Sequence, residues 1–246
     1  MNEAHDGWKR CIRTRQVGQR ILPVAHRAGV RHLAMEALHP NFAKKCNSNR
    51  RVPDEETGYL SQPEMKEFIQ TALDLGWTLI PYEANSLQWL SNKYNIVFQN
   101  PNDPQEPFDQ HQKFQADLMS MEFSNWREEQ QALNLIAALQ SLPTGTPMLV
   151  WCGNGHNAKM VIEDWKPTGY QFQRHSVINP FVIDQTRTVN FDSGETRVET
   201  ELAVQFVDQL TKHGGTAGFI TEEAPSIFGD DEIADALLRS TQNELE

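Results

Sequence analysis

The chain has 246 residues, of which 39% are apolar, and its 22 basic and 33 acidic residues give a formal net charge of −11. This is enough for one sizeable globular domain, and so acidic a surface disfavours binding to nucleic acids or to anionic membranes. No apolar run has the roughly 20 residues of a membrane helix, no signal peptide is evident, and the three cysteines lie far apart. We therefore expect a cytoplasmic protein with reduced thiols.

Helical patterns account for much of the chain. Residues 8–28 have a helical pattern, in which Pro23 is expected to break or kink the helix. Residues 61–75 begin with a capping serine, have a proline in the first turn and an apolar stripe, and end at Gly76. Two further helices are predicted, one within 110–141 and one over about 199–212.

Short apolar runs of strand length lie between these helices. Three of them, at 30–35, 77–82 and 148–152, are continuously apolar, which is typical of strands covered on both faces in a parallel sheet flanked by helices. Less certain strands are predicted at 177–183, 188–191, 216–220 and 236–239. The polar segments 41–58 and 100–107 are predicted to be surface loops.

These elements predict an α/β fold with a mainly parallel sheet flanked by helices, and with its site at the carboxyl edge of the strands. No repeat, low-complexity tract or linker divides the chain. We predict a single domain over residues 1–246, with a helical excursion at about 85–142.

Ionisable residues follow the three main predicted strands. Glu36 follows the first, Glu83 the second, and His156 the third after a Gly-Asn-Gly turn. Ligands of open parallel sheets bind beyond the carboxyl ends of the strands, so these groups are expected to converge on one edge. Glu3 and His5 would join them if their segment is extended, because residues two apart in a strand face the same way.

Each of these residues also has a structural interpretation. A carboxylate at a strand end often caps a helix or joins an ion pair, and for Glu83 this interpretation is favoured. For Glu36 the two interpretations are balanced, because burying an unpaired charge is costly. The turn before His156 favours function, whereas Glu3 and His5 can equally form a frayed end.

Several better-known motifs are absent. The chain has no G-x-S-x-G, Walker, G-x-G-x-x-G or H-E-x-x-H pattern, so a serine hydrolase, a nucleotide-binding protein and a zincin have no support. Cys152 is a possible thiol nucleophile, although buried packing is the commoner role of such a cysteine. The types of residue at Glu3, His5, Glu36 and His156 also suit a divalent metal, and the choice between metal and water stays open.

Two early segments resemble the erythromycin esterase-like family, within a wider group that includes haem-binding ChaN-like lipoproteins and the Tiki proteases. Residues 2–5, Asn-Glu-Ala-His, are similar to the family's Gly-Glu-x-His signature. Glu36 matches its second-strand glutamate. In the family an apolar first strand precedes the signature, whereas here only Met1 and Asn2 precede Glu3, which predicts either an unpaired sheet edge or a sequence that begins late.

Two later segments extend the resemblance to roughly residues 1–165. Residues 127–134 are similar to the helical Arg-Asp-x-x-Met-x-x-Asn signature, with glutamate in place of aspartate. Residues 150–160 are similar to Val-Trp-x-His-Asn-x-His-x-x-x-Met, in which Gly153 stands in place of the first histidine.

The resemblance implies a carboxylic ester hydrolase that cleaves an ester or related acyl bond in a small molecule with histidine-activated water. It assigns the base to His5, its support to Glu36 and Glu3, and polarisation of the carbonyl or stabilisation of its oxyanion to His156. Arg127 would anchor the site or neutralise Glu3 and Glu36. The predicted catalytic residues are thus Glu3, His5, Glu36 and His156, and the predicted substrate-binding residues are Glu83, Arg127 and Asn154.

Other functions remain open beside this one. The chain can instead be a non-catalytic protein that holds haem or a divalent metal at the same edge, or a degenerate family member that only binds a partner. The hydrolase itself requires no cofactor and acts on a small molecule, without nucleic acid or membrane. The oligomeric state stays open.

Overall fold

A computed structural model describes residues 1–3, 8–53, 59–96, 114–153, 155–180, 182–184 and 216–218. Its helices are α1 (Trp8–Arg27), α2 (Pro40–Asn49), α3 (Pro63–Asp74), α4 (Ser86–Tyr94), α6 (Met121–Gln140) and α7 (Thr168–His175), with a 3-10 turn η1 (Tyr59–Ser61). Its strands are β1 (His32–Met35), β2 (Thr78–Pro81), β3 (Leu149–Trp151), β4 (Val182–Asp184) and β5 (Thr216–Gly218).

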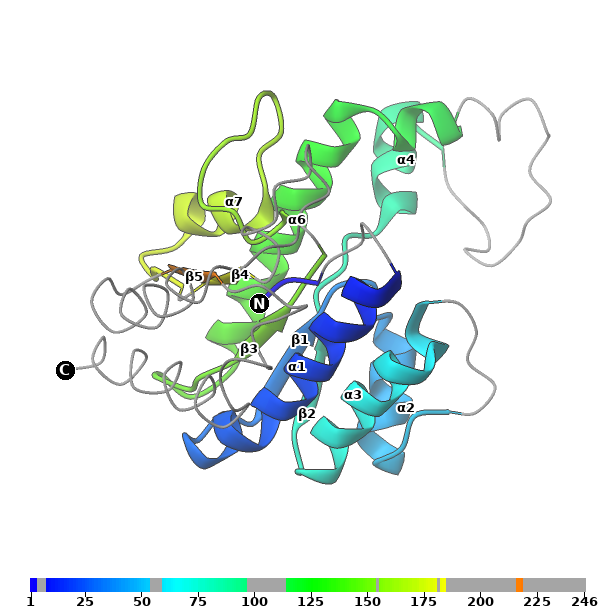
Figure 1. Cartoon of the computed structure of the whole chain (residues 1–246). Helices are drawn as coiled ribbons and strands as arrows, with labels where there is room; N and C mark the ends of the chain where they lie inside the picture. Colours follow the sequence, from blue (N-terminus) through cyan, green and yellow to red (C-terminus); the bar gives the residue numbers. More distant parts are fainter. Residues whose placement is uncertain are drawn as a thin grey trace.

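The main sheet is parallel and has the order β2-β1-β3 (Figure 1). In register, Leu33 of β1 pairs with Leu79 of β2 and with Leu149 of β3. Residues 1–3 lie beside the end of β3, since the N–H of Glu3 donates to the carbonyl of Cys152 over 2.8 Å. The predicted α/β class is therefore confirmed in its broad form, although the described sheet is small.

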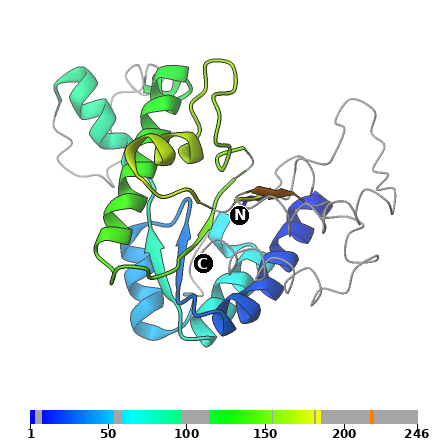
Figure 2. The same cartoon turned by 90° about the vertical axis from the view of Figure 1, so that its left-hand side faces the viewer.

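Helices cover both faces of this sheet, as Figure 2 shows. Side chains of β1 alternate between two cores: Leu33 and Met35 pack in the cluster with α1, α2 and α3, whereas Ala34 packs with Ala132 of α6 and Phe172 of α7. Each face is thus sealed by its own helices, and the carboxyl ends of the strands stay accessible to polar groups. A separate pair, β4 and β5, is also parallel.

Helix α1 continues through Pro23, so the predicted break is wrong. A proline in a helix interior costs about 3 kcal/mol because it removes a hydrogen bond and crowds the preceding turn. The residues around Pro23 offset this cost, since Ile21, Leu22 and Ala25 are all buried in the larger core. Earlier in α1, Gly18 lies against Trp151, and a Cβ there would come within 2.5 Å of the indole ring.

The predicted loop at 41–58 is also wrong, because its first part forms α2. Proline begins the helix, and Phe42, Ala43 and Cys46 form a buried stripe at helical spacing. The polar face has a function of its own: the amide of Asn47 accepts from the N–H of Leu79 over 2.8 Å and donates to its carbonyl over 2.9 Å. In this way α2 covers the outer edge of β2.

The other helices and strands follow the sequence more closely. Helix α3 ends at Asp74, two residues before Gly76, whose φ of +82° suits glycine, but its N-cap is Gln62 rather than the predicted serine. Helix α6 lies within the predicted 110–141. The predicted helix at 199–212, the strands at 188–191 and 236–239 and the loop at 100–107 fall outside the described residues. None of the described helices is long and apolar enough to cross a membrane.

Candidate functional site

The three strand-end groups meet at one edge of the sheet, as the strand pattern predicts. Glu36 follows β1, Glu83 follows β2, and His156 follows β3. Arg127, from the second turn of α6, joins them. The geometry brings these four predicted residues together, while their chemical roles stay predictions.

Arg127 binds two of the carboxylates at once. Its Nε donates to Glu83 over 2.8 Å, and its Nη2 donates to Glu83 and to Glu36, each over 2.6 Å. Within the described chain its Nη1 makes no hydrogen bond, and a quarter of the side chain is exposed. The guanidinium therefore retains a donor that a bound molecule can use.

Glu83 is more firmly held than its partners. Besides Arg127 it accepts from the side chain of Gln131 over 2.9 Å, from the N–H of Ala37 over 3.1 Å and from the N–H of Ala84 over 2.9 Å. With its acceptor positions so occupied, Glu83 acts as the anchor of Arg127. This matches the structural interpretation favoured for Glu83 from the sequence.

Glu36 lies between two positive groups. Its Oε1 accepts from Arg127 and lies 3.5 Å from Nε2 of His156, and its Oε2 accepts from the N–H of Gly153 over 2.6 Å. Burial alone would raise the pKa of Glu36, but the charges of His156 and Arg127 and the Gly153 N–H outweigh it and hold the pKa below its ordinary value. Gly153, where the resembling family has a histidine, thus contributes a backbone donor.

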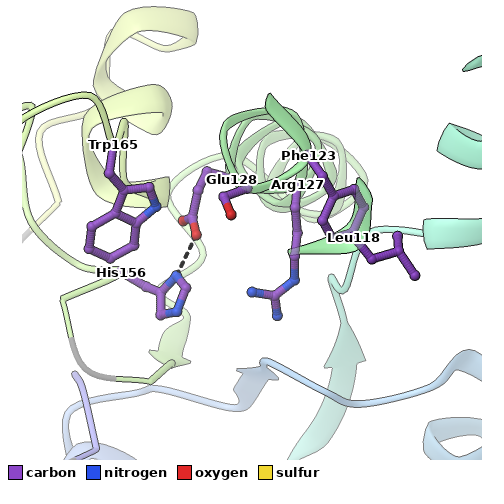
Figure 3. A pocket seen from close by; sticks show the side chains of 7 residues that line it. Leu118, Phe123, Arg127, Glu128, His156 and Trp165 are labelled. Atoms are coloured by element: carbon purple, nitrogen blue, oxygen red, sulfur yellow. Dashed lines mark ion pairs between the residues drawn. The ribbon is translucent and has the colours of Figure 1, made fainter. Parts of the chain in front are cut away.

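His156 is held from both sides by carboxylates. Its Nδ1 lies 2.7 Å from Oε1 of Glu128, an ion pair that Figure 3 draws, and its Nε2 faces Glu36. Burial would lower the pKa of His156, but the contact with Glu128 and the charge of Glu36 outweigh burial and raise the pKa. The ring is thereby favoured as an imidazolium, with Nε2 as its less firmly engaged donor.

A cavity of about 330 Å³ opens beside this group. In Figure 3, His156, Glu128 and Arg127 border it together with Trp165 and Phe123. The ring of Trp165 stands edge-on to His156, with centroids 5.2 Å apart. Leu118 and Ser124 complete the lining. The cavity lining therefore has charged side chains flanked on both sides by apolar ones, and small-molecule sites often combine the two kinds.

Glu3 lies in a different environment, which corrects one prediction. Its carboxylate is fully buried and accepts from Arg15 through Nε at 3.1 Å and Nη2 at 2.8 Å. It also accepts from Tyr59 over 2.9 Å and from the indole of Trp151 over 3.2 Å. The arginine that neutralises Glu3 is thus Arg15, not Arg127, because Trp151 and Tyr59 enclose Glu3 in the core.

Two predicted site residues, His5 and Asn154, lie outside the described residues. Cys152 is buried, which agrees with a packing role. The sequence prediction omitted Glu128, although it is buried and binds His156. A signal was available, because Glu128 stands next to Arg127 where the helical signature has an aspartate.

No metal centre emerges from the residues that the structure describes: no group of three or more His, Cys, Asp or Glu side chains there could hold a metal ion. The side chains at the sheet edge are instead bound to one another through arginine and histidine. Binding of a metal or haem is tested by titration, as described below.

A scan against protein-family models, a search of curated proteins and a search of solved structures each found no match to this chain. The resemblance to the erythromycin esterase-like family stays a prediction from its motifs.

Proposed function

We propose that this chain is a hydrolase that cleaves an ester or related acyl bond in a small molecule by adding water, without a covalent intermediate. The observation that carries the proposal is His156, which lines a cavity and forms a 2.7 Å ion pair through Nδ1 with the buried Glu128 carboxylate. A histidine oriented in this way, with an arginine beside it, is a common arrangement for acyl chemistry.

His156 and Arg127 act on the carbonyl. The raised pKa of His156 favours the imidazolium, and Nη1 of Arg127 has no hydrogen-bond partner in the described chain. Two cationic donors on one side of the cavity suit an oxygen that becomes negative as water attacks. Glu128 fixes the ring, and Glu83 fixes the guanidinium.

Water activation is assigned to His5 by the resemblance, with Glu36 as support. The lowered pKa of Glu36 keeps it ionised near neutral pH, so it suits an electrostatic role better than that of a base. Glu3 enters this scheme only indirectly, since it lies in the same segment as His5 and is anchored to Arg15.

The cavity also constrains the substrate. Its apolar side chains, Trp165 beside His156 and Phe123 and Leu118 beyond Arg127 (Figure 3), suit an apolar or aromatic group beside the scissile bond. The ion-paired cluster beside it has three acidic residues, Glu36, Glu83 and Glu128, and two basic ones, Arg127 and His156. An uncharged or cationic ester fits this balance better than an anionic one.

The test is hydrolysis of a panel of neutral, cationic and anionic aryl esters by the whole chain. His156→Ala should lower kcat/KM for a responsive ester by about 100- to 1,000-fold, the range expected for losing one donor to the developing oxyanion. His175→Ala is the matched control, because His175 also contacts a glutamate of α6, Glu129, over 2.8 Å but does so through Nε2 on an exposed pair outside the cavity lining.

Unchanged turnover in His156→Ala would overturn the proposal, as would the absence of hydrolysis across the panel. Titration with haem and with divalent ions belongs to the same experiment. Tight binding of either without hydrolysis would favour the non-catalytic alternative.

A further inference from the structure

The pairing of His156 with Glu128 depends on a third element. His156 lies in the loop after β3 and Glu128 lies on α6. Because they come from different elements, the backbone of neither element fixes the distance between them. Both are bound to the first turn of α7. This inference rests on the proposed function, because it concerns how that site is aligned.

Thr168, the first residue of α7, binds the Glu128 carboxylate twice. Its backbone N–H donates to Oε2 over 2.7 Å, and its hydroxyl donates to the same oxygen over 2.6 Å. Helix α7 has Pro167 at its N-cap and no side-chain cap of its own. The Glu128 carboxylate therefore serves as the cap, where the positive end of the helix dipole favours a negative charge.

Gly169, the next residue, binds the backbone of His156. Its N–H donates to the carbonyl of His156 over 2.8 Å. A Cβ at Gly169 would lie 2.5 Å from the carbonyl oxygen of Asn157, closer than such atoms approach in proteins. Consecutive residues of one helical turn thus hold the carboxylate and the histidine loop, and the second contact needs a glycine.

Thr168 also lies close to Gln131, which binds the carboxylate partner of Arg127. The Thr168 hydroxyl lies 2.8 Å from Oε1 of Gln131, and Nε2 of Gln131 donates to Glu83 over 2.9 Å. The hydroxyl has one hydrogen, so it donates to Glu128 or to Gln131, and the charged carboxylate is the stronger acceptor. Gln131 thus lies beside the His156–Glu128 pair and donates a hydrogen bond to Glu83 of the Glu83–Arg127 pair.

We propose that Thr168 and Gly169 are positioning residues of the hydrolytic site: the first turn of α7 aligns His156 with Glu128. Residues that orient a functional group through hydrogen bonds typically change activity by about 10- to 100-fold when removed. Thr168 and Gly169 do not line the cavity, so their effect is on alignment rather than on substrate contact.

Thr168→Val is the first test, because valine keeps the shape and the backbone N–H but removes the hydroxyl. We expect kcat to fall by about 10- to 100-fold with little change in KM. Thr168→Ser should restore most of the loss. Thr146→Val is the matched control, since its hydroxyl donates to the carbonyl of Pro143 in an exposed turn.

A readout without substrate separates this inference from the proposed function. NMR titration of the His156 imidazole follows its contact with Glu128 directly. In Thr168→Val the pKa of His156 should move down towards its ordinary value, and in Thr168→Ser it should not. Far-UV circular dichroism and thermal melting report whether each variant is folded.

Gly169→Ala is the second test and should shift the His156 resonances further than Thr168→Val does, because the methyl displaces the loop backbone. Should no ester be hydrolysed, the proposed function fails while the titration still decides the alignment. An unchanged titration of His156 in Thr168→Val and in folded Gly169→Ala would overturn the inference.

Discussion

Two arginines bind carboxylates at the carboxyl end of this sheet, in opposite environments. Arg15 and Glu3 are almost fully buried, at 1% and 0% exposed, and are enclosed by Tyr59 and Trp151. Arg127 is 25% exposed, binds two carboxylates and borders a cavity. The contrast separates two kinds of arginine–carboxylate pair: the buried one lies within the core, whereas the exposed one can also contact a ligand.

The matched substitutions Arg15→Met and Arg127→Met test this difference. Arg15→Met leaves the Glu3 carboxylate buried without its main partner, and breaking a buried pair in this way typically costs about 3–5 kcal/mol. The free energy of unfolding from urea titration measures it. Adding Glu3→Gln to Arg15→Met should recover part of the loss. A loss no larger than that of Arg127→Met would break the comparison.

Arg127→Met should cost less stability and more activity. Its guanidinium makes charged hydrogen bonds that are partly open to water, so we expect a loss of about 1.5–3 kcal/mol in the same urea titration. Ester hydrolysis should fall most in this variant, because the donor for the carbonyl oxygen is removed. Hydrolysis that survives Arg127→Met but not a folded Arg15→Met would reverse the assignment of the two sites.

The pH dependence of stability should come from the open site. Because the pKa of His156 is raised on folding, its contribution is complete below its ordinary value of 6.5 and is lost as pH rises through the raised value. Because the pKa of Glu36 is lowered, its contribution is complete above its ordinary value of 4.5 and is lost as pH falls through the lowered value. Both contributions are complete between about pH 4.5 and 6.5.

Urea titrations over a pH series check these signs. His156→Ala should flatten the decline in stability above pH 6.5, and Glu36→Gln should flatten the decline on the acidic side. A decline above pH 6.5 that persists in His156→Ala would show that another group controls it.

The smallest expected effect on stability and activity concerns Phe123, one of the apolar side chains that line the cavity. Ser120 caps α6 by accepting from the N–H of Phe123 over 3.1 Å, and Phe123 also packs against Trp89 of α4. Ser120→Ala should cost about 1 kcal/mol, the usual value for losing an N-cap. KM for an aryl ester should rise more than kcat falls. Asn85→Ala, which removes the comparable cap of α4, is the control.

The sheet and its polar edge could be predicted because both follow from local patterns. Continuous apolar runs identified β1, β2 and β3, and parallel strands bring Glu36, Glu83 and His156 to one edge. Arg127 came from the family motif alone. No local pattern places Arg127 near these groups, because α6 is distant from Glu36 and Glu83 along the chain and meets the strand ends only through tertiary packing.

Three other features could not be predicted from the sequence, because they depend on tertiary contacts. Helix α2 reads as a loop because its asparagines are polar, yet Asn47 uses that polarity to cover the edge of β2. The separation of Glu3 from the cavity depends on the burial of Arg15 and Trp151, which no spacing encodes. The role of Thr168 depends on the first turn of a helix from a distant segment reaching Glu128.

Gly18 connects these two environments through Trp151. The indole below it donates to Glu3, and the backbone carbonyl of Trp151 accepts from the N–H of Glu36 over 3.0 Å. Replacing a helical glycine by alanine commonly adds about 0.5–1 kcal/mol of stability. In Gly18→Ala the added methyl would instead collide with the indole of Trp151. A substitution that usually stabilises a helix would therefore displace Trp151 and disturb both arginine sites.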